Sequence, residues 1–430
     1  MKTNQRRDFL KLFGGAAAGL AIAPFFNTAF AKELQQRTTL LEGMSPLEVA
    51  GNEDFWTFIQ QSYTASPTII NLNNGGVSPQ PKVVQDAQDR FTRMSNEAPS
   101  YHMWRILDKG REPIRDALAE LSECSPEEIA INRNTTEALE TIVFGLNLNA
   151  GDEVIVSNFD YPNMMNAWKQ REKRDGIVLK KVVLDVPMED DKEIVKRFMD
   201  QVTSKTKIMH VTHLINWTGQ ILPAKKIIEA AHKKGVEVVL DGAHSFAHID
   251  YSIKDIDCDY YGTSLHKWLC APFGTGFMFV KKEKIKNLWP LFPGDEPNSD
   301  DIRKFEVLGT RSFPAEQAIG NAVEFHKGIG ILRKEDRLRY LKNYWMERVR
   351  DVENIKLYTS FQPPYACALA TVGVQGKTAN EIHEFLYKKY KIHTTTIDHE
   401  GVNGVRITPH VYTTIDQLDR LVKALKEFAG

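Results

Sequence analysis

An aspartate and a lysine each follow a short apolar run near the middle of the chain. Residues 236–240, VEVVL, are apolar and mostly β-branched apart from Glu237, which predicts a strand buried on both faces, and Asp241 comes directly after them. A second apolar run at 260–262 leads through a short turn to Lys267. Because the carboxyl ends of parallel strands share one edge of a sheet, we expect the acid and the amine to lie together there, where ligands bind.

An acid and an amine placed in this way suit the cofactor pyridoxal phosphate (PLP). The amine of Lys267 would form a Schiff base with PLP. The carboxylate of Asp241 would pair with the pyridine nitrogen and keep it protonated, which makes the ring an electron sink. Taken alone, however, the pair is more typical of a helix-capping aspartate and a solvated lysine.

The residues around the pair favour the cofactor. The stretch from 241 to 268, DGAHSFAHIDYSIKDIDCDYYGTSLHKW, closely resembles the class V aminotransferase superfamily of PLP enzymes. The overlapping stretch HKWLCAPFGTGFMFV is most similar to the isopenicillin N epimerase branch. The resemblance covers roughly residues 67–428 and implies that Lys267 and Asp241 are catalytic. It also implies the α/β fold of PLP-dependent transferases, fold type I.

A polar turn further upstream is a candidate anion site. A predicted strand at 128–132 is followed by Asn134, Thr135 and Thr136, where a helix begins. Free N–H groups, hydroxyls and the positive end of the helix dipole attract an anion, although the same residue types also serve as plain helix caps. The sequence RNTTEAL resembles the segment that holds the PLP phosphate in this family. The resemblance adds two phosphate ligands, Ser264 and His266.

The resemblance implies roles for further residues around the cofactor ring. Tyr161 matches the position of a ring stacked over the cofactor. The alternative is a tyrosine that only packs within its loop. Asn216 matches an asparagine close to the phenolic oxygen of PLP. His244 stands three residues after Asp241, where the epimerase branch has histidine and the desulfurase branch has glutamine.

Two more residues are expected to contact an amino acid substrate. Arg406 lies in VRITPHVY, which resembles the family segment whose arginine grips the substrate α-carboxylate. Asn74 lies in the LNNGG loop, which the family places near the active site. By residue type alone these are a surface arginine on a strand and a turn asparagine.

A shared active site in a homodimer follows from Thr310. Residues 305–311 resemble the family segment that reaches into the neighbouring subunit and touches its phosphate. We therefore expect a homodimer in which each subunit lends Thr310 to its partner.

Strands and helices alternate along most of the chain. This pattern predicts a mostly parallel, doubly wound sheet in a large domain at 67–330, preceded by a helical segment at 32–66. Residues 331–430 predict a small α+β domain, with strands at 365–374, 392–397 and 404–407. Capping boxes at Thr378 and Thr414 mark its helices.

The composition is globular, with 42% hydrophobic residues and a net charge of −1. Near-neutral charge argues against a nucleic-acid partner, and we expect no metal ion. Residues 1–31 resemble a twin-arginine signal peptide, with Arg6 and Arg7, an apolar core at 12–26 and a cleavage site before Lys32. This predicts export by the Tat machinery to the periplasm or beyond, without a stable membrane anchor. A disordered basic tail is the alternative.

The reaction itself stays open at this level. Lys267 would act as general base at Cα of an amino acid, a step shared by epimerisation, transamination and C–S cleavage. A desulfurase needs a cysteine in the loop before Arg406, and residues 394–404 contain none. A C–S lyase needs no further side chain. An epimerase needs a second acid/base, for which the candidates are Tyr101, His102 and His213. A non-catalytic binding protein with the same fold would not need both Lys267 and Asp241.

Overall fold

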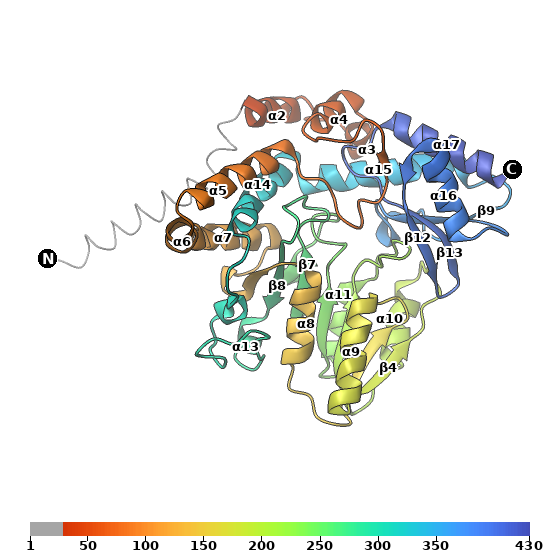
Figure 1. Cartoon of the computed structure of the whole chain (residues 1–430). Helices are drawn as coiled ribbons and strands as arrows, with labels where there is room; N and C mark the ends of the chain where they lie inside the picture. Colours follow the sequence, from red (N-terminus) through yellow and green to blue (C-terminus); the bar gives the residue numbers. More distant parts are fainter. Residues whose placement is uncertain (1–28) are drawn as a thin grey trace.

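The computed structural model describes residues 29–430, which form a large domain, a small C-terminal domain and an N-terminal group of helices (Figure 1). Most of the predicted export signal, including Arg6 and Arg7, lies outside the described residues. The predicted cleavage site falls at the start of helix α2 (Ala29–Thr39). There the ring of Phe30 stacks on Phe58, with ring centroids 4.8 Å apart.

The large domain is built on a seven-stranded sheet in the order β2-β8-β7-β6-β5-β3-β4. Four neighbouring pairs, from β7 to β4, are parallel, while β8 runs antiparallel to both β7 and β2. This confirms the predicted mostly parallel sheet. The strands are β2 (Ile129–Asn132), β3 (Glu153–Ser157), β4 (Val178–Val182), β5 (Thr206–Thr212), β6 (Glu237–Asp241), β7 (Tyr260–Ser264) and β8 (Gly276–Val280).

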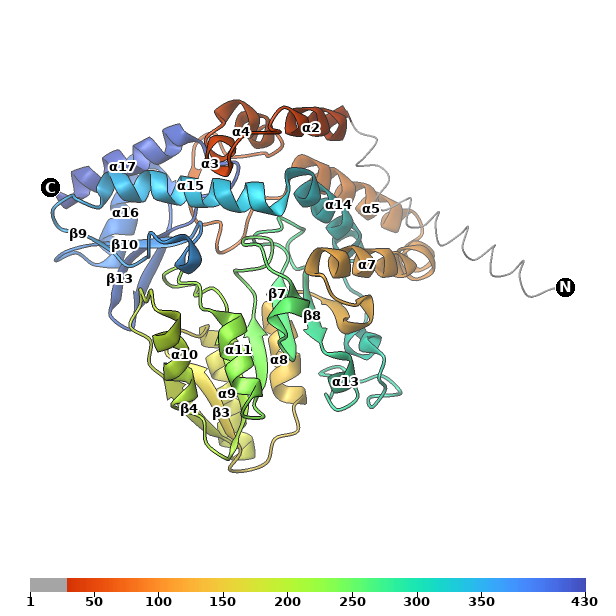
Figure 2. The ribbon, with the colours of Figure 1, turned by 180° about the vertical axis from the view of Figure 1, so that it is seen from behind.

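Both faces of this sheet are covered by helices, which explains the continuous apolar runs of its central strands. Helices α8 (Thr135–Gly145) and α9 (Pro162–Asp175) cover one face, and α10 (Asp191–Met199) and α11 (Ala224–His232) cover the other (Figures 1 and 2). In β6, Val238 and Leu240 pack into one core cluster, whereas Val239 packs into the other. Successive residues of a strand point to opposite faces, so a strand buried on both sides must be apolar throughout.

A further layer of helices lies over the carboxyl edge of the sheet and leads to the small domain. Helices α5 (Lys82–Glu97) and α14 (Phe313–Ile329) pack together, and the long helix α15 (Ile331–Val349) continues into the small domain (Figure 2). Helices α3 (Pro46–Ala50), α4 (Glu53–Gln60), α6 (Pro99–Tyr101) and α7 (Arg111–Ser122) lie with them. The short helices α12 (Ile253–Ile256) and α13 (Lys282–Ile285) lie instead at the opposite edge of the sheet, before β7 and after β8.

The small domain has a four-stranded antiparallel sheet in the order β12-β13-β10-β9, flanked by two helices. Its elements are β9 (Ile355–Leu357), β10 (Ala370–Val374), α16 (Ala379–Tyr390), β12 (Thr395–His399), β13 (Val402–Ile407) and α17 (Ile415–Ala429). Both predicted capping boxes, at Thr378 and Thr414, are present.

Two predicted strands of this domain are corrected by the structure. Strand β10 begins at Ala370 rather than near 365, because the preceding N–H of Ala368 donates to His248 of the large domain instead of joining the ladder. The predicted strand at 392–397 is divided into β11 (Ile392–His393), which pairs with β1 (Ile70–Asn71), and β12.

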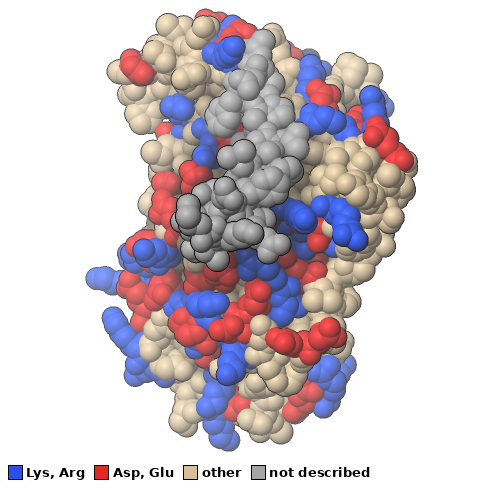
Figure 3. All heavy atoms as spheres, turned by 90° about the vertical axis from the view of Figure 1, so that its left-hand side faces the viewer, with Lys and Arg blue, Asp and Glu red and all other residues tan. Residues whose placement is uncertain are grey.

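The surface seen in Figure 3 carries intermingled positive and negative side chains. Among the described residues, Arg303 pairs with Glu112, Glu127 and Asp301. No helix within residues 29–430 is long and apolar enough to cross a membrane.

Candidate active site

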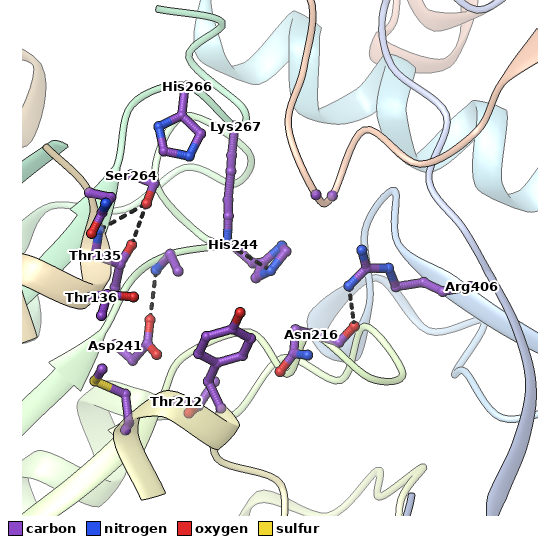
Figure 4. Close-up of a pocket in the computed structure, with 16 residues that line it drawn as sticks. Thr135, Thr136, Thr212, Asn216, Asp241, His244, Ser264, His266, Lys267 and Arg406 are labelled. Carbon is purple, nitrogen blue, oxygen red and sulfur yellow. Dashed lines mark hydrogen bonds between the residues drawn. The ribbon is translucent and has the colours of Figure 1, made fainter. Parts of the chain in front are cut away.

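A pocket of about 290 Å³ opens at the carboxyl ends of the central strands, where the large and small domains meet. It collects the predicted site residues except Asn74 and Thr310. Thr135, Thr136 and Ser264 gather on one side and Arg406 lies on the opposite side, with Lys267 and His244 between them (Figure 4). The pocket therefore has an anion-binding end, a central amine and a guanidinium.

Asp241 ends β6 at the floor of the pocket. Its Oδ1 accepts the N–H of Ala243 at 2.9 Å, which orients the carboxyl group. Burial raises the pKa of Asp241, although nearby His210 and the Ala243 N–H act in the opposite direction. A buried carboxyl group held in this way is suited to sharing a proton with a ring nitrogen.

Lys267 and His244 form the central contact of the pocket. Lys267 Nζ lies 3.1 Å from His244 Nε2. His244 is buried, and Lys267 is half-buried at the pocket. Burial lowers the pKa of Lys267 to about 8, and Arg406 contributes in the same direction while Asp241 opposes it. Burial and the neighbouring Lys267 lower the pKa of His244 well below its usual value, so the imidazole is neutral. With Nε2 as the acceptor, its proton is assigned to Nδ1, a buried atom without a protein partner.

The anion-binding end is formed at the start of α8. The side chain of Asn134 caps this helix by accepting the N–H of Glu137 at 2.9 Å. Ser264, from the end of β7, accepts the N–H of Thr135 at 2.9 Å, and the two hydroxyls are 2.7 Å apart. Thr136 follows in the first turn. Asn134 is thus a helix cap, and the turn that it shapes also presents N–H and hydroxyl groups to the pocket.

A glycine of the sheet and the ring of His266 lie next to this turn. A Cβ at Gly276 would lie 2.8 Å from Cα of Asn134, so the neighbouring strand β8 must have glycine there. His266 lies beside the turn, and its Nδ1 is 3.1 Å from the carbonyl oxygen of Thr275. Burial lowers the pKa of His266 to about 4, and a neutral ring that donates from Nδ1 leaves Nε2 as an acceptor.

The opposite end of the pocket contains Arg406, from β13 of the small domain. Its Nη1 donates to the carbonyl oxygen of Asn216 at 2.9 Å, and its Nη2 donates to Oδ1 of Asn73 at 3.0 Å. Burial lowers the pKa of Arg406 to about 10, and Tyr161 is the neighbouring group that raises it. The Nε of Arg406 and the Oδ1 of Asn216 are buried without a partner. Neither atom therefore has its hydrogen-bonding capacity satisfied within the protein.

Asn74, a predicted substrate contact, is not among the residues that line the pocket. Its Nδ2 donates to the carbonyl oxygens of Thr408 and Asn71, at 2.7 and 3.2 Å, and its Oδ1 accepts from Tyr412 and from Nδ2 of Asn71. All the hydrogen-bonding capacity of the amide is therefore used within the protein. Asn74 instead fixes the loop that brings its neighbours Gly75 and Gly76 to the pocket.

The remaining predicted residues lie elsewhere in the same chain. Thr310 is exposed and does not line the pocket of its own chain. The three candidates for a second acid/base are also outside it: Tyr101 is exposed, the ring of His102 contacts the Met94 carbonyl, and His213 is buried against Tyr251.

Several lining residues were not found from the sequence. Thr212 is paired in register with Asp241, and its hydroxyl donates to Oδ1 of Asp160 at 2.8 Å. It ends a predicted strand, so the same edge-of-sheet argument could have found it. Ala243 follows Asp241 closely, but Met164 is an apolar residue of α9 that carries no signal in the sequence.

The residues of the pocket fit PLP. The hydroxyl and N–H groups of the α8 turn suit a phosphate, and Asp241 suits a ring nitrogen. The unpartnered Asn216 Oδ1 and His244 Nδ1 suit the polar substituents of a ring between them. Lys267 supplies an amine of lowered pKa in the centre. The fold and this set of side chains together define a PLP-dependent enzyme of fold type I.

Comparison with known proteins assigns the family. The model of the family described as "Aminotransferase class-V" matches residues 70–421. The chain belongs to this family, whose members are PLP-dependent enzymes, and PLP is its cofactor.

The curated relatives carry out several reactions. The chain is 28% identical to isopenicillin N epimerase of Amycolatopsis lactamdurans over 87% of this chain and 98% of the relative. It is 26% identical to a probable cysteine desulfurase of Synechocystis sp., over 87% and 94% of the two chains. It is 22% identical to hercynylcysteine sulfoxide lyase of Schizosaccharomyces pombe, over 89% and 100%.

Solved structures share the fold. A C-DES mutant with glycine covalently linked to the PLP cofactor superposes with a TM-score of 0.77 at 19% identity, covering 86% of this chain and 99% of that one. The cysteine desulfurase CsdA of Escherichia coli has a TM-score of 0.77 at 20% identity, over 86% and 98%.

Proposed function

We propose that this enzyme acts at Cα of an amino acid, or of a small molecule that contains one, as an epimerase or racemase or an aminotransferase similar to isopenicillin N epimerase. The observation that carries the proposal is the contact of Lys267 with neutral His244 in a pocket that also contains buried Arg406. This arrangement combines a base for a carbon-bound proton with a guanidinium for a carboxylate.

Each residue of the pocket has a separate role in the proposed reaction. PLP, when bound, withdraws electrons from Cα of an attached amino acid. Arg406, which lines the pocket, binds the α-carboxylate through its guanidinium and orients the molecule. Lys267, whose pKa of about 8 leaves part of it neutral near pH 7, takes the Cα proton at Nζ. His244 accepts a hydrogen bond from this amine at Nε2 and so directs it.

The proposal also includes a second proton carrier. Besides Lys267 and Arg406, the titratable side chains among the described lining residues are Tyr161, Asp241, His244 and His266. Lys267 follows β7, whereas Tyr161 follows β3, and strands β6 and β5 separate the two. Tyr161 therefore approaches the pocket from the far side of Asp241, and we propose it as the acid/base opposite Lys267 in place of the three earlier candidates.

Persulfide chemistry of the desulfurase type is disfavoured by the hairpin of β12 and β13. This segment lacks cysteine, and its tip is fastened to the large domain. His399 Nε2 lies 2.8 Å from the carbonyl oxygen of Asn158, and its ring stacks on Trp217 with centroids 4.3 Å apart. Glu400 pairs with Lys181 at 3.1 Å. A C–S lyase, which needs no cysteine on this hairpin, is the second candidate, and the similarity to hercynylcysteine sulfoxide lyase favours it.

Two further proposals concern the setting of the enzyme. We propose a homodimer in which Thr310 contributes to the partner's site, because Thr310 is exposed and outside its own pocket.

We also propose export by the twin-arginine pathway to the periplasm or beyond, which the Arg6–Arg7 motif supports. That pathway carries folded proteins, which agrees with a cofactor loaded in the cytoplasm.

A panel of L- and D-amino acids tests the proposed reaction. Purified enzyme would be assayed for exchange of the α-hydrogen with deuterated water, and then for racemisation, keto acid and sulfide. Racemisation or keto acid supports the first candidate, and sulfide supports the lyase. Lys267→Ala is the control that should abolish each signal. No exchange with any amino acid, and no change of the visible spectrum, would favour a binding protein instead.

A further inference from the structure

Lys334 is a buried amine that the proposed reaction does not use. It lies near the start of α15, with 3% of its surface exposed. Its Nζ donates to the main-chain carbonyl of Trp268 and lies 3.4 Å from Nδ1 of His326. Within residues 29–430, no carboxylate lies within ion-pair distance of it. Burying an amine without a counter-ion costs free energy of folding, so the contact of Lys334 with Trp268 should have a function that offsets this cost.

Trp268 directly follows Lys267 and is held from both domains. Its fully buried ring stacks between His248, with centroids 3.7 Å apart, and His410, with centroids 5.6 Å apart. His248 Nδ1 lies 2.7 Å from the carbonyl oxygen of His244, and its Nε2 accepts the N–H of Ala368 at 3.0 Å. Through His248, the ring stack is connected to His244, which contacts Lys267, and to Ala368 of the small domain.

The turn after Lys267 is conformationally strained. The N–H of Cys270 donates to the carbonyl oxygen of Lys267 at 3.2 Å, and Cys270 has a φ of 59°. A left-handed conformation is unfavourable for a residue other than glycine and persists where neighbours enforce it. One such neighbour is His410, whose Nε2 lies 3.4 Å from Sγ of Cys270. The bond from Lys334 to Trp268 holds the same turn at its middle.

We propose that Lys334 is a positioning residue that locks the turn from Lys267 to Cys270 and so aims the Lys267 amine at the cofactor. The proposal rests on the role of Lys267 given above. Lys334 acts through the Trp268 carbonyl and does not line the pocket. Since α15 leads from the large domain into the small one, the same bond fixes Lys267 relative to the domain that carries Arg406 (Figure 2).

The chain supplies a matched control on the same helix. Lys342 is also buried, donates to a single main-chain carbonyl, that of Ser360 at 2.8 Å, and has a pKa lowered by burial to about 8, as Lys334 has. It lies two turns further along α15, at the small domain. Lys334→Met and Lys342→Met therefore remove equivalent interactions, but only the first removes one next to Lys267.

The test measures attachment of PLP separately from its binding. Wild type, Lys334→Met and Lys342→Met would be saturated with PLP and total bound PLP determined by dialysis. Borohydride reduction followed by peptide mass spectrometry then gives the fraction fixed to Lys267. Losing a hydrogen bond from a charged donor changes an equilibrium by roughly ten- to a hundredfold. We expect the ratio of linked to unlinked PLP to fall by at least about tenfold in Lys334→Met, with total binding little changed, and to stay at the wild-type level in Lys342→Met.

Three outcomes are decisive. An unchanged ratio in Lys334→Met, or an equal fall in Lys342→Met, overturns the positioning role. Fixation of PLP to a residue other than Lys267 in the wild type overturns the proposed active site itself. If Lys334→Met does not fold, the pair Lys334→Gln and Lys342→Gln replaces it. The neutral, shorter amide cannot match the reach of Lys334, so the same difference between the two variants is expected, and equality overturns the proposal.

Discussion

Lys267 Nζ and His244 Nε2 lie 3.1 Å apart in the pocket, where His244 is buried and Lys267 is half-buried. The imidazole is kept neutral by burial and by the adjacent amine, so it accepts rather than competes for a proton. This contact holds the amine in the middle of the pocket, between the anion-binding turn and Arg406 (Figure 4). The predictions below follow from that position.

Lys267→Ala should retain PLP without a covalent link. Thr135 and Ser264 hydrogen-bond to each other in the anion-binding end of the pocket, and these bonds do not involve Lys267, so the phosphate should still be bound. We expect bound PLP to lack the visible absorption band of the lysine-linked cofactor, with circular dichroism of the protein unchanged. A variant that kept the band would show that another amine holds the cofactor.

The rate of PLP attachment to the apoenzyme should depend on pH through Lys267. The neutral amine is the nucleophile, and the pKa of Lys267 is lowered to about 8, so the rate should rise about tenfold per pH unit below 8 and level off above it. Arg406 helps to lower this pKa, so Arg406→Gln should move the midpoint to higher pH. Asp241 raises the pKa, so Asp241→Asn should move the midpoint to lower pH. Stopped-flow absorbance measures both shifts, and shifts in the same direction would contradict the assigned charges.

Asp241→Asn should also separate cofactor binding from turnover. The amide can still accept the N–H of Ala243, so the pocket should keep its shape. A neutral partner cannot hold a proton on the ring nitrogen, so α-hydrogen exchange should fall by orders of magnitude while PLP content stays near one per chain. Near-normal exchange in this variant would remove the electron-sink role of Asp241.

Much of this site could be predicted because its residues follow the ends of strands. The strand before Asp241 is apolar on both faces, and the start of α8 combines a cap with hydroxyls, so both positions are visible in the local sequence. The contacts that were missed depend on distant segments. Asn74 is taken out of the pocket by Thr408 and Tyr412 of the small domain, and no local pattern near Asn74 reports this. The predicted start of the strand at 365–374 was wrong for a similar reason, because His248 accepts the N–H of Ala368.

Replacement of Arg6 and Arg7 by lysine tests the proposed export route. The twin-arginine machinery reads the arginine pair, so the double variant should leave the precursor in the cytoplasm. Fractionation and N-terminal sequencing of the wild type should find a mature form in the periplasm that begins near Lys32. Equal export of both forms would remove the twin-arginine assignment.

A shared active site gives Thr310 a role that a single chain does not. Thr310 is exposed and outside the pocket of its own chain, and we propose from the family resemblance that it reaches the phosphate of a neighbour across a two-fold axis. A hydrogen bond to a charged phosphate contributes roughly 1.5–3 kcal/mol, so Thr310→Ala should weaken PLP retention by about ten- to a hundredfold. Heterodimers of Lys267→Ala and Thr310→Ala chains sharpen the test at limiting PLP. If Thr310 acts across the interface, one site carries both defects and the other carries neither, so the heterodimer should regain about half of the wild-type activity.

If Thr310 acts within its own chain, each site of the heterodimer carries one defect and no activity returns. Sedimentation as a monomer, or no recovery on mixing, would leave Thr310 as an ordinary loop hydroxyl.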